Sequence, residues 1–353
     1  MVNIHEKYIK RCIQLAKNGL GSTYPNPLVG SVVVYKDKVI GEGWHLMTGK
    51  PHAEVNAINS VKDKSLFPKA TIYVSLEPCS HFGKTPPCSD LIIDKGIKNV
   101  VIGSVDPYVK VSGRGIKKLM EAGCNVTVGI LEKECADLNK RFFTFHTKKR
   151  PYIILKWAES KDRFISPLIR GKSEPEGKPV WITNKISRQL VHKWRSEEQS
   201  IMVGTQTALH DNPGLTTRDW YGKSPLRLVL DRKSGIPQNL SLFNGEAPTL
   251  VFTEVKSNEL ANQGVSYKVT PFDKYLLPAV LEVLYKDNIQ SLIVEGGSYT
   301  INSFLKEGLW DEARVFTGNQ TFKEGTPAPL IKGKCIKEQK IVSDKLCIWI
   351  NKT

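Results

Sequence analysis

The chain has 353 residues and an ordinary apolar content of 40%, which is enough for two domains that each bury a core. It contains no run of about 18 apolar residues and no apolar signal stretch near residue 1, so we expect a cytoplasmic protein without a membrane partner. The net charge of +16 is spread along the chain without a basic and aromatic stripe. We therefore expect no nucleic-acid partner. Two explanations of the positive charge stay open: solvated surface lysines, or a ligand that carries a phosphate.

The first part of the chain alternates between predicted helices and strands. Apolar residues recur at helical spacing from His5 to Leu20. A hairpin of strands 31–35 and 39–44 follows. Further helices are expected at 54–59, 89–95 and 116–122, and further strands at 71–76, 100–103 and 126–128. This alternation predicts a three-layer α/β sandwich.

A polar segment that ends in proline, 148–151, is a reasonable domain junction. We therefore expect one domain over residues 1–147 and a second over residues 148–353. The second domain is again predicted to be α/β. Its expected strands are 152–157, 200–203, 226–230, 249–252 and 291–294, and its expected helices are 185–195 and 277–288.

A candidate zinc site is formed by His52, Cys79 and Cys88, with Glu54 close to the histidine. Seven cysteines in a cytoplasmic chain do not indicate a disulfide framework, and the close pair favours metal binding. Three protein ligands leave the fourth position of zinc for water, whose pKa the metal lowers. Glu54 then shuttles protons to the departing amine. A zinc bound by one histidine and two cysteines, with a glutamate that does not bind the metal, is typical of zinc nucleobase deaminases.

Each of these residues alone is weak evidence. A single cysteine is usually a small buried hydrophobe, and a His-x-Glu triplet is common. A structural zinc needs a fourth protein ligand, for which His81 is the nearby candidate. A structural zinc has no use for Glu54, so the conjunction indicates hydrolytic deamination.

The spacing between the two cysteines is specific. Eight residues separate Cys79 from Cys88, whereas nucleic-acid and free-nucleotide deaminases generally place two residues there. The segment 76–88 resembles the bifunctional riboflavin-biosynthesis deaminase/reductase family. The likeness extends to the segments 25–30, 43–45, 106–107 and 113–115.

The resemblance implies a cytidine-deaminase-like sandwich that removes the 2-amino group of 2,5-diamino-6-(5-phosphoribosylamino)pyrimidin-4-one. It places the substrate contacts on Asn26, His45, Lys84 and Asp106. Lys84 suits a phosphate, although a solvated loop lysine remains the alternative. Tyr108 stands where many members have asparagine, so no contact is transferred to it.

The second half contains a Glu295-Gly296-Gly297 turn that follows a strand and opens a helix. Backbone N–H groups of such a turn can hold a phosphate, but the turn alone is weak evidence and lacks a Rossmann fingerprint. The order and spacing of the segments 181–183, 203–205, 211–213 and 228–231 resemble the family's reductase domain. The resemblance implies a dihydrofolate-reductase-like α/β fold in which NADPH reduces the ribosyl group to ribityl.

The family's contacts transfer position by position to this half. The NADPH contacts fall on Ala158, Trp181, Thr207, Asp211, Gly297, Ser298, Tyr299, Thr300, Ile301, Asn302 and Ser303. The substrate contacts fall on Arg195, Leu215, Arg218 and Glu295. The two arginines suit bidentate phosphate binding, although each alone could be a surface residue.

Two residues of this half depart from the family pattern. Arg163 replaces a glycine near the cofactor, and Pro179 replaces a serine that contacts substrate, so that contact is dropped. We expect Zn2+ and NADPH as cofactors, a phosphoribosylated pyrimidine as ligand and, from the resemblance, a homo-oligomer. Two alternatives stay open: a deaminase of RNA or free nucleotides with a non-reductase second domain, and a non-catalytic zinc protein.

Overall fold

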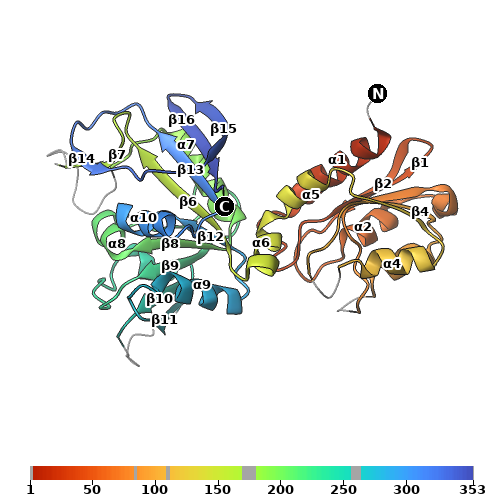
Figure 1. Cartoon of the computed structure of the whole chain (residues 1–353), viewed down its shortest axis with the longest axis horizontal. Helices are drawn as coiled ribbons and strands as arrows, with labels where there is room; N and C mark the ends of the chain where they lie inside the picture. The colour runs from red at the N-terminus through yellow and green to blue at the C-terminus, as the bar shows by residue number, and fades with distance from the viewer. Residues whose placement is uncertain (1–2, 83–85, 109–111, 169–179, 256–263, 353) are drawn as a thin grey trace. The chain divides into compact units, whose positions relative to one another are not determined.

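The computed structural model describes residues 3–82, 86–108, 112–168, 180–255 and 264–352. The chain divides into two compact units, Met1–Lys149 and Arg150–Thr353 (Figure 1). Each unit contains its own sheet. Within the described ranges, no helix is both long and apolar enough to cross a membrane.

The first unit is built on a five-stranded sheet in the order β2-β1-β3-β4-β5. The strands are β1 (Gly30–Tyr35), β2 (Lys38–Trp44), β3 (Thr71–Leu76), β4 (Asn99–Ser104) and β5 (Asn125–Val128). Strand β1 is antiparallel to β2 and β3, whereas β3, β4 and β5 are parallel. Because Leu76 pairs with Ser104, the segments that carry Cys79 and Asp106 leave the sheet at the same edge.

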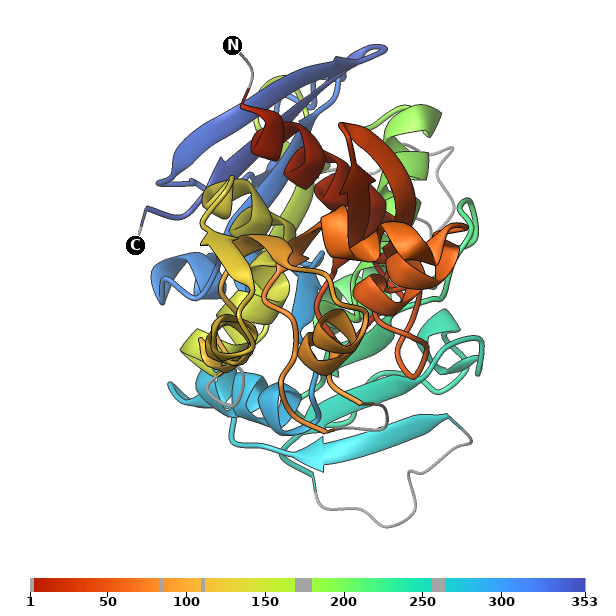
Figure 2. The same cartoon turned by 90° about the vertical axis from the view of Figure 1, so that its right-hand side faces the viewer.

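Helices cover both faces of this sheet. On one face, α2 (Ala53–Ser60), α3 (Cys88–Asp94) and α4 (Arg114–Glu121) bury Ile58, Ile92 and Leu119 against the strands. On the other face, α1 (Ile4–Ala16) and α5 (Glu132–Leu138) form a second apolar cluster. Figure 2 shows α1, in dark red, lying across the β1–β2 hairpin. The helices η1 (Lys17–Gly19), η2 (Lys64–Lys69) and α6 (Lys140–Lys148) complete the unit. The predicted three-layer sandwich is confirmed.

The second unit contains a nine-stranded sheet in the order β11-β10-β9-β8-β12-β6-β13-β16-β15. Its strands are β6 (Tyr152–Glu159), β8 (Ser200–Gly204), β9 (Leu226–Leu230), β10 (Thr249–Thr253), β11 (Val265–Val269), β12 (Ser291–Val294), β13 (Glu312–Thr317), β15 (Lys334–Ile341) and β16 (Asp344–Ile350). The short strands β7 (Phe164–Pro167) and β14 (Gly325–Pro327) pair separately. Strand β12 lies between β6 and β8 and is parallel to both, so the carboxyl ends of these three strands meet at one edge. Ligands of open α/β sheets bind at such an edge.

Helices also cover both faces of the second sheet. The helices α9 (Leu276–Lys286) and α10 (Ser298–Lys306) pack on one face through Leu281 and Ile301. The helices α7 (Lys185–Glu197), α8 (Thr205–Asp211) and η3 (Ser241–Phe243) pack on the other face through Val191, Ala208 and Leu242. The predicted α/β class of this half is therefore confirmed.

Several predicted boundaries need correction. The first helix ends at Ala16 and continues as a short 3-10 turn to Gly19, so Leu20 is not helical. Helix α3 begins at Cys88 and includes this ligand in its first turn. Strands β11, β13, β15 and β16 and helices α5, α6 and α8 were not among the predicted elements.

Candidate functional sites

The sulfur and nitrogen atoms of the three predicted zinc ligands converge. His52 Nδ1 lies 3.7 Å from Cys79 Sγ and 3.4 Å from Cys88 Sγ, and the three atoms lie within 4.8 Å of one another. His52 is the N-cap of α2, Cys79 follows β3, and Cys88 is the first residue of α3. The site is therefore built from two helix starts and one strand end.

This triad fits zinc. Zinc–nitrogen bonds of about 2.1 Å and zinc–sulfur bonds of about 2.3 Å place tetrahedral ligands about 3.6 Å apart. The nitrogen–sulfur separations of 3.7 and 3.4 Å in the structure lie on either side of that value. The donor set of one imidazole and two thiols is also a usual zinc set. The chain thus has a zinc-binding site at His52, Cys79 and Cys88.

Hydrogen bonds among the three ligands decide which of them ionises first when no metal is bound. A hydrogen bond from Cys88 and another from His52 lower the pKa of Cys79 to about 4, although burial opposes this. The hydrogen bond between His52 and Cys79 raises the pKa of His52 to about 9. The hydrogen bond between Cys88 and Cys79, together with burial, raises the pKa of Cys88 well above its usual value. Cys79 is thus the first thiolate. Its sulfur also accepts the backbone N–H of Cys88 at 3.3 Å.

Glu54 lies beside the triad in the first turn of α2 and is 3% exposed. Burial raises the pKa of Glu54 to about 7, although the positive charge of His52 opposes the shift. A carboxyl group with this pKa can both accept and release a proton near neutral pH. That property is what general acid–base catalysis requires.

Asn26 and His45 lie next to the zinc ligands. The Asn26 side-chain amide is 3.1 Å from His45 Nε2, and His45 Nδ1 is 3.1 Å from the carbonyl of Pro51. The His45 ring stands edge-on to the His52 ring with centroids 5.4 Å apart. The two contacts of His45 orient its ring, and burial lowers its pKa, so the ring is neutral near pH 7.

Asp106 is buried at the same edge of the sheet and accepts the backbone N–H of Tyr108 at 2.7 Å. Burial raises the pKa of Asp106 to about 6. The loop that carries Asp106 is held by Glu77, which accepts the backbone N–H groups of Asp106, Gly113, Gly115 and Ile116 at 2.9–3.3 Å. Sequence reasoning assigned Glu77 no role. Lys84 lies outside the described residues.

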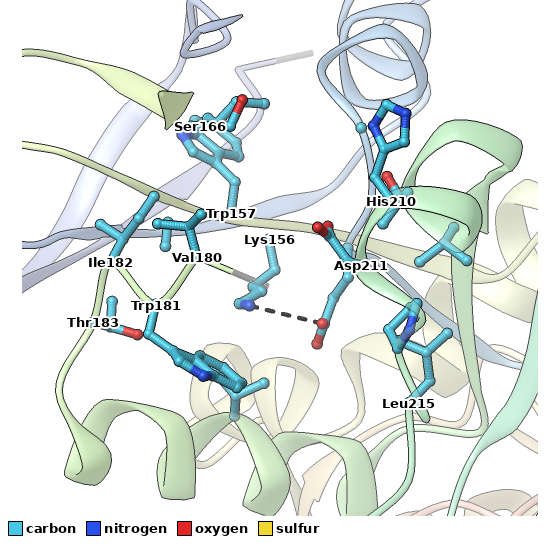
Figure 3. A pocket seen from close by; sticks show the side chains of 18 of the residues that line it. Lys156, Trp157, Ser166, Val180, Trp181, Ile182, Thr183, His210, Asp211 and Leu215 are labelled. Carbon is cyan, nitrogen blue, oxygen red and sulfur yellow. Dashed lines mark ion pairs between the residues drawn. The ribbon is translucent and has the colours of Figure 1, made fainter. Parts of the chain in front are cut away.

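A second candidate site is a pocket of about 690 Å³ in the second unit. It lies where the carboxyl ends of β6, β8 and β12 meet. Figure 3 shows Lys156 in the middle of the pocket, with Trp181 on one side and Asp211 and Leu215 on the other. This volume is typical of sites for small molecules and cofactors.

The floor of the pocket contains two cations and one carboxylate. Glu295 Oε2 lies 2.8 Å from Arg195 Nη2 and 3.7 Å from Lys156 Nζ. Burial raises the pKa of Glu295, but Arg195 and Lys156 outweigh it and bring the value to about 2. The floor therefore carries a net positive charge, which favours electron-rich or anionic ligands.

Most of the predicted reductase residues line this pocket. The lining includes Ala158, Trp181, Thr207, Asp211, Gly297, Ser298, Tyr299, Ile301, Arg195, Leu215, Arg218 and Glu295. Thr300, Asn302 and Ser303 do not line it. Asn302 instead donates to Ser298 Oγ, and the Ser303 hydroxyl donates to the carbonyl of Tyr299.

The glycine turn before α10 is shaped for close contact. Gly297 has a φ of +60°, and a side chain there would meet Thr207 Oγ1 at 3.2 Å. A side chain at Gly296 would meet Val203 at 2.8 Å. The backbone of the turn thus packs directly against Thr207 and Val203, and the N-terminus of α10 at Gly297 lines the pocket. N–H groups at such a helix start favour a phosphate.

Comparison with known proteins finds a separate family model in each of the two units. A family model of the RibD C-terminal domain matches residues 151–326, and one of the cytidine and deoxycytidylate deaminase zinc-binding region matches residues 2–104. The riboflavin biosynthesis protein RibD of Aquifex aeolicus is 42% identical over 327 residues, which cover 91% of this chain and 89% of that protein. The chain belongs to the RibD family. It is thus a bifunctional deaminase and reductase of riboflavin biosynthesis.

Other RibD proteins support the same conclusion. RibD of Bacillus amyloliquefaciens is 41% identical over 96% of this chain and 91% of its own length. The crystal structure of a diaminohydroxyphosphoribosylaminopyrimidine deaminase/5-amino-6-(5-phosphoribosylamino)uracil reductase from Thermotoga maritima matches with a TM-score of 0.88. It has 38% identity and 99% coverage of both chains. The predicted family is confirmed, and the match of residues 151–326 argues against a non-reductase second domain.

Sequence reasoning missed some residues of the RibD reductase pocket. Lys156 and His192 line it, and both are largely buried. A lysine within the apolar run of β6 was an available signal for Lys156. His192 lies one helical turn before Arg195 on α7, a signal that is visible only once Arg195 is placed.

The departures from the RibD pattern have different structural settings. Arg163 has a φ of +68°, a left-handed conformation that glycine adopts without strain. The Tyr108 ring packs on His146 with centroids 4.8 Å apart. Pro179 lies outside the described residues.

Proposed function

We propose that the first unit hydrolyses the 2-amino group of 2,5-diamino-6-(5-phosphoribosylamino)pyrimidin-4-one. In this proposal the second unit then reduces the ribosyl group of the deaminated product to ribityl with NADPH. The observation that carries the first step is the convergence of His52, Cys79 and Cys88 beside the buried Glu54. The name of the similar Thermotoga maritima protein supports this pair of substrates.

In the deamination step, bound zinc supplies a water that ionises near neutral pH. Glu54 takes a proton from the attacking water as the water oxygen bonds to the ring carbon, and it gives the proton to the amine, which leaves as ammonia when the carbon–nitrogen bond breaks. Asn26 and His45 contact the pyrimidine ring, and Asp106 orients it from the other strand end. Lys84 binds the phosphate. The hydrogen bonds of His45 to Asn26 and Pro51 support this assignment because they fix its ring beside the zinc ligands.

In the reduction step, bound NADPH supplies a hydride. The chain's residues orient the two reactants. The start of α10 at Gly297, together with Trp181, Thr207 and Asp211, holds the cofactor. Ala158 and residues 298–303 complete the proposed set of cofactor contacts. Within this run, Thr300, Asn302 and Ser303 do not line the pocket.

The reductase substrate lies at the charged floor in this proposal. Glu295, Arg195 and Lys156 surround the ribose, and Lys156 Nζ is the nearby proton donor because the strand holds it inside the pocket. Leu215 contacts the ring. Arg218 binds the phosphate with a bidentate guanidinium.

We further propose that the chemistry divides at the predicted boundary, with deamination in residues 1–147 and reduction in residues 148–353. The protein is proposed to act in the cytoplasm as a homo-oligomer, with no nucleic-acid or membrane partner.

One assay tests both steps. The zinc-loaded protein is given the diaminopyrimidinone ribotide and NADPH, while ammonia release and NADPH oxidation are followed together. We expect one ammonia and one oxidised NADPH for each substrate. Without ammonia the deaminase proposal is wrong, and ammonia without NADPH oxidation contradicts the reductase proposal.

A further inference from the structure

His192 is a buried histidine of α7 that none of the proposed reaction steps uses. It is 4% exposed and lines the reductase pocket. Its two ring nitrogens contact the same loop. Nδ1 accepts the backbone N–H of Arg218 at 3.3 Å, and Nε2 lies 3.4 Å from Asp219 Oδ2.

The side chains of two arginines and His192 form hydrogen bonds with the backbone of the loop 214–218 at every second residue. Arg227 donates to the carbonyl of Gly214 at 3.3 Å, and Arg195 donates to the carbonyl of Thr216 at 3.2 Å. His192 then accepts the N–H of Arg218. The first two contacts restrain the part of the loop before Arg218, and among the described residues His192 is the side chain that binds the Arg218 backbone itself.

The two arginines proposed for anion binding are not equivalent. The Arg195 guanidinium already contacts both oxygens of Glu295, at 2.8 and 3.3 Å. Among the described residues, none forms an ion pair with the Arg218 guanidinium, and Arg218 lines the pocket. Of these two arginines, Arg218 is therefore the one that remains available to a phosphate, and its position matters more for binding.

We propose that His192 is a positioning residue of the reductase: it holds the Arg218 backbone so that the Arg218 guanidinium meets the phosphate of the substrate. The inference rests on the proposed function, because that function supplies the phosphate. The neutral imidazole with its proton on Nε2 satisfies both contacts. Burial, together with the charges of Arg195 and Arg218, lowers the pKa of His192 to about 4, which agrees with an acceptor at Nδ1.

A matched pair of variants tests this role. Asparagine at position 192 places its side-chain oxygen near the Nδ1 position, whereas glutamine places its amide near Nε2 and leaves the N–H of Arg218 without its acceptor. NADPH oxidation is measured with 5-amino-6-(5-phosphoribosylamino)uracil and with the same compound lacking the phosphate. Both variants are polar, and thermal unfolding of each full-length protein verifies that it folds.

We expect His192→Gln to raise KM for the phosphorylated substrate about fivefold to tenfold, the effect of one lost hydrogen bond. The kcat value and KM for NADPH change less than about twofold, and His192→Asn behaves like the parent. The effect of His192→Gln disappears with the dephosphorylated compound and in an Arg218→Gln background. An equal rise in KM for both compounds, or a further rise in the double variant, overturns the inference.

A binding measurement separates this inference from the proposed function. If the parent protein does not oxidise NADPH with either compound, the proposed reductase function fails. Titration calorimetry with ribose 5-phosphate then tests the inference alone. Weaker binding to His192→Gln than to His192→Asn supports it, and equal binding to both variants or no binding to the parent overturns it.

Discussion

Arg195 and Glu295 are 100 residues apart in the chain and form a buried ion pair, with Arg195 Nη2 2.8 Å from Glu295 Oε2. The Arg195 side chain is 10% exposed and that of Glu295 is 7% exposed. Lys156 Nζ lies 3.7 Å from the same carboxylate oxygen. The pair therefore joins α7 to the turn after β12 and fixes the charge at the floor of the pocket.

The loss of this carboxylate leaves two cations without a counter-ion. We expect Glu295→Gln to lower the free energy of unfolding by about 3 kcal/mol. Breaking a buried ion pair is costly because the remaining charge stays buried without a compensating partner. Urea unfolding of the full chain measures this difference. Glu254→Gln is a matched control, because Glu254 pairs with Arg232 at 2.8 Å on an exposed surface, where solvent screens the pair, and the substitution is expected to change stability much less than Glu295→Gln.

The effect of Glu295 also depends on pH. The pKa of Glu295 is lowered from 4.5 to about 2, so its stabilising charge is present above pH 4.5 and is lost as the pH falls toward 2. We expect the stability difference between the parent and Glu295→Gln to be constant from pH 5 to about 8 and to shrink below pH 4.5. A difference at pH 3 as large as that at pH 7 contradicts this assignment.

The zinc centre could be predicted from the sequence because its residues lie in short local motifs. His52 and Glu54 start one helix, and Cys79 and Cys88 flank one loop. Most of the predicted strands were also locally encoded as apolar runs, as in Thr71–Leu76 and Ser291–Val294. The helix boundaries shifted by a few residues because capping, as at Cys88, depends on the folded neighbours.

The reductase pocket was less accessible to sequence reasoning. Strand β13 joins the sheet by long-range pairing with β6, and β15 pairs with β16 in a hairpin but is almost entirely exposed, so its apolar pattern is weak. Lys156 and His192 become pocket residues only when three separate strands and α7 are assembled. The run 297–303 was assigned as a whole, although a helix presents only one side to the pocket, and Thr300, Asn302 and Ser303 do not line it.

Glu54→Gln separates proton transfer from zinc binding. Because Glu54 is beside the triad but is not one of its three donors, we expect the variant to keep its zinc content. Ammonia release should fall by a factor of about 10² to 10⁴, the usual contribution of a general acid–base. Elemental analysis and an ammonia assay measure the two quantities. Glu42→Gln is the control, because Glu42 forms a surface ion pair with Arg11 and is expected to leave ammonia release unchanged. Retained ammonia release in Glu54→Gln would refute the role of Glu54 as a proton shuttle.

Metal removal should affect only one activity. Dialysis against a strong chelator is expected to abolish ammonia release, and added Zn2+ should restore it. NADPH oxidation with the already deaminated substrate should stay within about twofold, because the lining of the reductase pocket includes none of the three zinc ligands. Cys88→Ser should reproduce the chelator's effect. Loss of reductase activity on chelation, without unfolding, would contradict separate sites.

Arg163→Gly tests the departure in the turn between β6 and β7. Arg163 adopts a φ of +68°, which costs a non-glycine residue roughly 1 kcal/mol. Its guanidinium gains little in return, since it is half exposed and lies 3.4 Å from the carbonyl of Pro329 and 3.9 Å from Glu159. We therefore expect glycine to raise the free energy of unfolding by about 0.5–1 kcal/mol.

Arg163→Ala is the control for this substitution, because it removes the same side-chain contacts and keeps the strained backbone. We expect alanine to be neutral or slightly destabilising in the same urea titration. The turn itself should survive in both variants, since Asp162 accepts the backbone N–H groups of Phe322 and Lys323 at 2.7–3.1 Å whichever residue follows it. If glycine and alanine change stability equally, the effect belongs to the lost side chain and not to the left-handed backbone at position 163.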